Sequence, residues 1–105
     1  MSEDFSKVCH ENDLSQGDIR TFNIEGNPIL LIKHGDKIYA LDNTCTHDGA
    51  ELSDGDLVDG QIQCARHGGR FNLETGEATQ MPAVVGIESY RVEIRDGEIY
   101  VSLKK

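Results

Sequence analysis

Tryptophan is missing from this sequence, and long hydrophobic runs and basic residues are scarce. The longest unbroken aliphatic stretch, Ile29 to Ile32, is far shorter than the roughly 20 apolar residues that cross a bilayer, so we expect no membrane partner. The acidic start, Met1 to Asp4, lacks the basic and then apolar pattern of a secretion signal, which favours a cytoplasmic location.

The scarcity of basic residues limits the classes of partner. Lys and Arg number 10 against 19 Asp and Glu, which gives a formal net charge of −9. Nucleic acids and anionic membrane surfaces attract basic proteins, so we expect neither as a partner. The acidity has two interpretations. In one it keeps a small protein soluble, and in the other it guides docking to a basic redox partner. The acids that form either a solvated face or a docking rim are Asp48, Glu51, Asp54, Asp56 and Asp59.

Cysteine is also sparse, with three residues that cannot all pair with one another. A reducing compartment would leave them as thiols that are free to bind metal. Cys9 stands apart from the other two, and we expect it to be a buried, inert thiol. His10 and His34 are expected on the surface beside turns.

The chain is expected to form a single domain, residues 1–105, of the all-β class. Its 11 glycines and two prolines interrupt it about every eight to twelve residues, which is typical of short strands joined by turns. Asp59-Gly60 is a strong signal for a type I′ hairpin turn. We expect at most a turn or two of helix, around residues 11–14. The predicted strands are 5–9, 19–24, 29–34, 37–41, 57–58, 61–64, 70–73, 77–79, 89–95 and 98–103.

Two expected loops, residues 43–50 and 65–69, carry the pairs Cys45-Thr46-His47 and Cys64-Ala65-Arg66-His67. Each pair offers one thiolate and one imidazole from a tight loop, and a [2Fe–2S] core needs four protein ligands. Two neutral imidazoles on one iron, in place of thiolates, raise the reduction potential into a range of about −150 to +300 mV. We expect both cysteines on one iron and both histidines on the other. A structural zinc site remains an alternative, although zinc modules usually begin with C-x₂₋₄-C.

The pattern CTH, LSDGDLVDGQIQC, HGG-F, TG and MPA resembles the Rieske family, and more narrowly the Rieske-type ferredoxins that serve bacterial aromatic-ring-hydroxylating dioxygenases. The resemblance implies a Rieske fold of stacked antiparallel sheets, with an inserted cluster-binding subdomain at about residues 43–83. The stretch Met81-Pro82-Ala83 is expected to form a third, rigid loop over the cluster. The ligands of the one [2Fe–2S] cluster that the resemblance assigns are Cys45, His47, Cys64 and His67.

The same resemblance implies an electron carrier and not a complete enzyme. Such a carrier accepts one electron from an NAD(P)H-dependent flavin reductase and passes it to a terminal oxygenase that has its own Rieske cluster and a mononuclear iron. We expect a soluble monomer that takes part in aromatic hydrocarbon catabolism. The alternative within the family is the small subunit of a nitrite-reductase-type complex.

Four positions differ from the Rieske proteins of respiratory complexes. Those proteins have a disulfide between the cluster loops, whereas Ala50 and Arg66 stand at the matching positions and exclude it. They also have serine and tyrosine hydroxyls that raise the potential, where this chain has Gly69 and Phe71. These differences predict a potential at the low end of the Rieske range.

Overall fold

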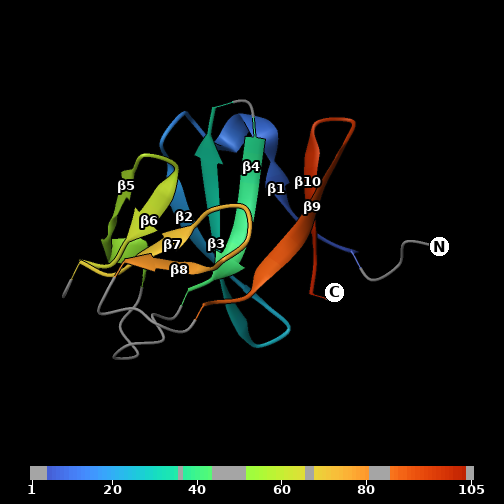
Figure 1. Ribbon diagram of the computed structural model, residues 1–105. Coiled ribbons are helices and arrows are strands. Elements are labelled where there is room, and N and C mark those ends of the chain that lie inside the picture. Colours follow the sequence, from blue (N-terminus) through green and yellow to red (C-terminus); the bar gives the residue numbers. More distant parts are fainter. Residues whose placement is uncertain (1–4, 36, 44–51, 66–67, 81–85, 104–105) are drawn as a thin grey trace.

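The computed structural model describes residues 5–35, 37–43, 52–65, 68–80 and 86–103 (Figure 1). These residues form two antiparallel sheets and two single-turn 3₁₀ helices, as expected for an all-β domain. No helix in the described part of the chain is long and apolar enough to cross a membrane.

The larger sheet has six strands in the order β1-β10-β9-β4-β3-β2. Its strands are β1 (Phe5–His10), β2 (Ile19–Ile24), β3 (Asn27–His34), β4 (Lys37–Asp42), β9 (Ser89–Arg95) and β10 (Glu98–Ser102). The smaller sheet has four strands in the order β5-β6-β7-β8. These are β5 (Asp56–Val58), β6 (Gln61–Gln63), β7 (Arg70–Asn72) and β8 (Ala78–Gln80). The 3₁₀ helices are η1 (Glu11–Asp13) and η2 (Leu52–Asp54).

Strand β3 separates two hydrophobic clusters because its four central residues are all apolar and all buried. Side chains alternate between the two faces of a strand, so Leu30 and Ile32 enter one cluster and Ile29 and Leu31 enter the other. The first cluster, which we call the inter-sheet core, fills the space between the two sheets. Its residues are Leu30, Ile32, Leu41, Leu52, Ile62, Cys64, Phe71, Leu73 and Ile87.

The second cluster packs on the other face of β3, with contributions from β1, β9 and β10. The expected alternation in β9 is present, because Tyr90 and Val92 lie against this cluster while Arg91 is exposed. Ile94 continues the pattern but lies beyond the cluster and is 45% exposed. On the outer face, the guanidinium of Arg95 stacks over the rings of both Phe5 and Tyr100.

The hairpin turns explain most of the strand boundaries. Asp59 and Gly60 have φ values of 49° and 77°, which fits the predicted type I′ turn. Glu25 and Gly26 form a similar turn between β2 and β3, with φ values of 52° and 85°, that the sequence did not predict. Glutamate is unusual in the left-handed region, so this turn lacks the usual Asn-Gly or Asp-Gly signal. Helix η2 was likewise not predicted.

Candidate metal centre

One row of residues crosses the smaller sheet at the edge next to the second Cys–His segment. Asp56 pairs with Gln63, Gln63 with Arg70, and Arg70 with Gln80. The Arg70 Nε–H donates to Gln63 Oε1 at 2.8 Å and ties two of these strands together. Residue 64 follows this row directly, and so does residue 81. The second Cys–His segment and the predicted third loop therefore start from the same edge of the sheet.

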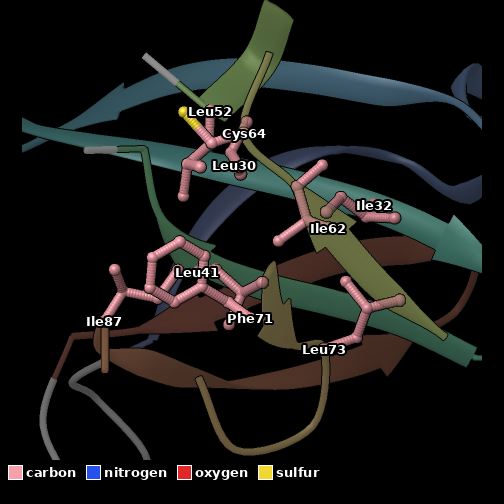
Figure 2. Packing of buried hydrophobic residues seen from close by; sticks show 9 residues of the cluster. All are labelled: Leu30, Ile32, Leu41, Leu52, Ile62, Cys64, Phe71, Leu73 and Ile87. Carbon is pink, nitrogen blue, oxygen red and sulfur yellow. The ribbon is translucent and has the colours of Figure 1, made fainter. Parts of the chain in front are cut away.

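Cys64 lies just beyond β6, and its side chain is directed into the inter-sheet core. It is 2% exposed and shares this core with Leu30 and Leu52, as Figure 2 shows. Two backbone hydrogen bonds close the loop that begins here. The Cys64 N–H donates to the Gly69 carbonyl at 2.7 Å, and the Gly68 N–H donates to the Cys64 carbonyl at 3.1 Å. Gly68 has a φ of 79°, a conformation that glycine adopts without strain.

The described residues on either side of the first Cys–His segment are bonded directly to each other. The Leu52 N–H donates to the Asn43 carbonyl at 3.2 Å, and the Ser53 N–H donates to the Asn43 Oδ1 at 2.9 Å. Asn43 also donates its own N–H to the Pro28 carbonyl at 3.0 Å. Its side chain is 4% exposed, so these bonds form in a largely dry environment. The two ends of residues 44–51 are thus held together against β3.

A close backbone contact then holds η2 against β6. A Cβ atom added to Gly55 would lie 2.0 Å from the Gln63 carbonyl oxygen, so only glycine fits at this position. Gln63 is the residue before Cys64, and Leu52 lies in the same core as Cys64. The contact therefore fixes the end of the first Cys–His segment beside the start of the second.

Residues after the third predicted loop return to the same region. The Ile87 N–H donates to the Gly76 carbonyl at 2.8 Å, and a Cβ on Gly76 would lie 2.1 Å from the Ile87 oxygen. Ile87 then packs into the inter-sheet core with Phe71. The Asp42 N–H donates to the Glu88 carbonyl at 3.0 Å, so this return lies beside the end of β4.

Of the four predicted ligands, the structure describes Cys64, while Cys45, His47 and His67 lie outside the described residues, as does Met81-Pro82-Ala83. Among the residues that are described, no three His, Cys, Asp or Glu side chains come together as a metal site. The Cys64 environment still fits a [2Fe–2S] group. The buried Cys64 thiol can bind iron in a site with little solvent, and the sequence contains a second thiol at Cys45 and imidazoles at His47 and His67.

The other cysteine and the two other histidines singled out in the sequence lie in the larger sheet. Cys9 is half-buried beside the second cluster, and not fully buried as expected. Burial raises the pKa of its thiol, and the Asp13 carboxylate raises that pKa further. His10 is not a simple surface residue, because its Nδ1 accepts the Asn12 N–H at 3.0 Å and caps η1. His34 is exposed, as expected.

Sequence reasoning missed Asn43 and Gly55, the residues that hold the cluster-binding segments together. No local signal was present for Asn43, because the Ser53 N–H that its side chain accepts lies ten residues further along the chain. A hollow of about 220 Å³ lies beside Asn43 and is lined by Thr21, Phe22, Asn23 and Pro28. None of these side chains titrates, so the hollow offers no acid–base catalysis.

Comparison with known proteins shows the family to which this chain is similar. Residues 4–91 match the family model described as the Rieske [2Fe-2S] domain. Ferredoxin CarAc of Metapseudomonas resinovorans is 40% identical over 106 residues, which cover 100% of this chain and 99% of that protein. The ferredoxin component of the naphthalene 1,2-dioxygenase system of Pseudomonas putida is 37% identical over 92 residues, or 88% of each chain.

A solved structure is similar to this chain over nearly its full length. The solved complex of reduced oxygenase and oxidized ferredoxin in carbazole 1,9a-dioxygenase contains a chain that is 39% identical to this one and superposes on it with a TM-score of 0.91. The match covers 99% of this chain and 97% of that one. The protein is an electron carrier with one [2Fe–2S] cluster, and it is not the catalytic component of a system. The chain belongs to the Rieske [2Fe–2S] family, and within it to the ferredoxins.

Proposed function

We propose that this ferredoxin carries single electrons from an NAD(P)H-dependent flavin reductase to a terminal Rieske non-haem iron oxygenase that acts on aromatic compounds. The observation that supports this most directly is its full-length similarity to a ferredoxin found in complex with an oxygenase. The proposal includes a soluble, monomeric carrier in the cytoplasm. It also includes a cluster-binding subdomain at about residues 43–83, built on the smaller sheet.

The cluster is proposed to bind through Cys45 and Cys64 on one iron and through His47 and His67 on the other. When bound, it accepts and releases one electron at a time. Cys64 holds its thiolate at the end of the inter-sheet core, where Leu30 and Leu52 limit the access of water. The apolar surroundings and the missing hydroxyls at Gly69 and Phe71 both favour a potential at the low end of the Rieske range.

The ligand assignment is tested with a matched pair of cysteine variants. In Cys64→Ser a buried ligand is removed, whereas Cys9→Ser changes a half-buried thiol on β1 outside the proposed site. We expect Cys64→Ser to lose iron, acid-labile sulfide and the EPR signal of the reduced cluster after anaerobic reconstitution. Cys9→Ser should retain all three. A Cys64→Ser protein with a full iron content would refute the assignment.

The carrier function is tested by reconstituting electron transfer. The ferredoxin is mixed with a purified flavin reductase, NADH and a terminal oxygenase, and the coupled oxidation of NADH and hydroxylation of an aromatic substrate are measured. We expect hydroxylation to depend on the ferredoxin and to saturate with its concentration. If the reductase reduces the ferredoxin but no oxygenase accepts its electrons, and a sirohaem nitrite reductase does, the nitrite-reductase alternative replaces the proposal.

A further inference from the structure

Asn43 makes three hydrogen bonds at the point where β4 ends and the first Cys–His segment begins. Its N–H donates to the Pro28 carbonyl, its carbonyl accepts the Leu52 N–H, and its Oδ1 accepts the Ser53 N–H, with lengths of 3.0, 3.2 and 2.9 Å. The first bond fixes Asn43 to β3, and the other two fix the far end of residues 44–51 to Asn43. Asn43 thus holds together the described residues on either side of that segment.

The placement of η2 relative to Cys64 then depends on Asn43. Ser53 and Leu52 belong to η2, and the next contact along the chain is the close approach of Gly55 to the Gln63 backbone. Leu52 and Cys64 pack in the same core. A continuous series of contacts therefore runs from Asn43 through η2 to the residue that precedes Cys64.

Burial makes the side-chain bond more important than a surface bond of the same length. Asn43 is 4% exposed, so removing Oδ1 breaks a hydrogen bond to the Ser53 N–H that is partly shielded from water. The described part of the chain has no buried side-chain nitrogen or oxygen without a hydrogen bond, so the loss of this bond would depart from an otherwise fully paired interior. Without the bond, the Leu52 backbone bond to the Asn43 carbonyl remains, and η2 is held less tightly to the end of β4.

We propose that Asn43 is a positioning residue for the cluster, which holds Leu52 and Ser53, the described residues that follow the first Cys–His segment, beside Cys64. This inference rests on the proposed ligand assignment. Residues that orient metal ligands without touching the metal typically contribute about 10- to 100-fold to metal affinity. Asn43 acts in this way through the backbone of η2, and not by contact with iron.

The test compares Asn43→Leu with Asn43→Asp. Leucine has a similar volume but no acceptor, whereas aspartate keeps an oxygen in the place of Oδ1 whether or not it is ionised. We expect Asn43→Leu to lose iron to a chelator about tenfold faster than the wild type and to show a broadened EPR spectrum of the reduced cluster. Asn43→Asp keeps the acceptor but buries a carboxyl group, so it should lie between Asn43→Leu and the wild type in both measurements.

Gln16→Leu is the matched control for a merely structural effect. The Gln16 amide also joins two loops, since its Nε2 donates to the Gly35 carbonyl at 2.9 Å and its Oε1 accepts the Gly35 N–H at 2.7 Å. This contact lies at the opposite end of β3 from Pro28. We expect Gln16→Leu to lower the thermal midpoint of unfolding without changing the EPR spectrum or the rate of iron loss. The rate of iron loss of each protein is measured at a temperature equally far below its own midpoint.

The outcomes separate the inference from the proposed function. An Asn43→Leu protein with a wild-type EPR spectrum and a wild-type rate of iron loss would overturn the positioning role, while its bound cluster would leave the function intact. Equal effects in Gln16→Leu and Asn43→Leu would also overturn it, because the loss would then be one of general stability. A wild-type protein that binds no cluster would refute the proposed function itself.

Discussion

At the scale of single residues, Phe71 connects the packing of the core to the reduction potential. Its ring is completely buried in the inter-sheet core that also holds Cys64, and the resemblance to the Rieske family implies a tyrosine at this position in the respiratory proteins. A hydroxyl at this position would donate a hydrogen bond towards a cluster thiolate. The reduced cluster carries one more negative charge than the oxidised one, so such a bond stabilises it preferentially.

We therefore expect Phe71→Tyr to raise the midpoint potential, measured by protein-film voltammetry. Phe5→Tyr, on the outer face of β1, is the control that adds the same hydroxyl far from the core and should leave the potential unchanged. An unchanged or lower potential in Phe71→Tyr, with the visible spectrum of the cluster retained, would contradict the explanation of the low potential.

The Cys9 thiol gives a second prediction at this scale. Burial and the Asp13 carboxylate raise its pKa, so the folded protein holds the proton at a pH where a free cysteine has lost it. We expect Cys9 to react with iodoacetamide more slowly than free cysteine between about pH 8 and 10, with its pH–rate curve displaced to higher pH. Mass spectrometry of the labelled holoprotein measures this directly.

The sign of the related effect on stability follows from the same shift. A thiol with a raised pKa in the folded state binds its proton more tightly there than in the unfolded chain, so its contribution is complete below the unfolded pKa and is lost as pH rises through the folded pKa. Cys9→Ser should remove that part of the alkaline loss of stability. A Cys9 that is alkylated as fast as free cysteine throughout this pH range would contradict the shift.

At the scale of elements, the contact between η2 and β6 depends on a glycine. Gly55→Ala would place a methyl group 2.0 Å from the Gln63 carbonyl, so η2 must move away from β6. We expect a loss of about 1–3 kcal/mol in the free energy of unfolding, as is usual for overpacking, together with faster loss of the cluster. Chemical denaturation followed by circular dichroism and by visible absorbance measures both effects.

Gly26→Ala is the comparison for this prediction. Gly26 has a φ of 85°, but an added Cβ would meet no atom within 4 Å, so the cost is backbone strain alone, about 1 kcal/mol. Its cluster should be retained at the wild-type rate. If the two variants lost iron equally fast, the contact of η2 with β6 would have no special role.

Most of the elements could be predicted from the sequence because their causes are local. The strand pairs around Asp59-Gly60 and Asp96-Gly97 combine period-2 alternation with a turn dipeptide, and the structure has both hairpins. Helix η2 could not be predicted, because its residues are fixed by Asn43 and by the backbone of β6, which are distant in sequence. The roles of Asn43 and Gly55 could not be predicted for the same reason. The Cys–His spacing could be recognised because it is a local feature of the sequence.

At the scale of the whole molecule, the fold revises which acids can form a docking rim. Asp56 lies in the row at the edge next to the second Cys–His segment, whereas Asp59 lies in the turn at the other end of β5. At about 3.4 Å per residue, this places the two carboxylates about 10 Å apart along the strand. Both are exposed and both carry the same charge, so they form a natural pair for comparison.

We expect Asp56→Asn to slow electron transfer to the oxygenase or from the reductase by about two- to fivefold at low salt, and to flatten its dependence on ionic strength. Asp59→Asn should have a smaller effect, because its charge lies farther from the site of electron exit. Stopped-flow measurements over a series of salt concentrations test both variants. Equal responses would indicate that net charge alone, and not a local rim, governs the encounter.

Strand β3 is buried on both faces, and this has a consequence for the way the protein opens. Leu30 and Ile32 belong to the inter-sheet core, and Ile29 and Leu31 belong to the second hydrophobic cluster. Separating either group of side chains therefore requires β3 to move. The amide protons of β3 should therefore exchange with deuterated solvent only through global unfolding, the slowest class of exchange. Release of iron would then accelerate exchange in the larger sheet as well as in the smaller one.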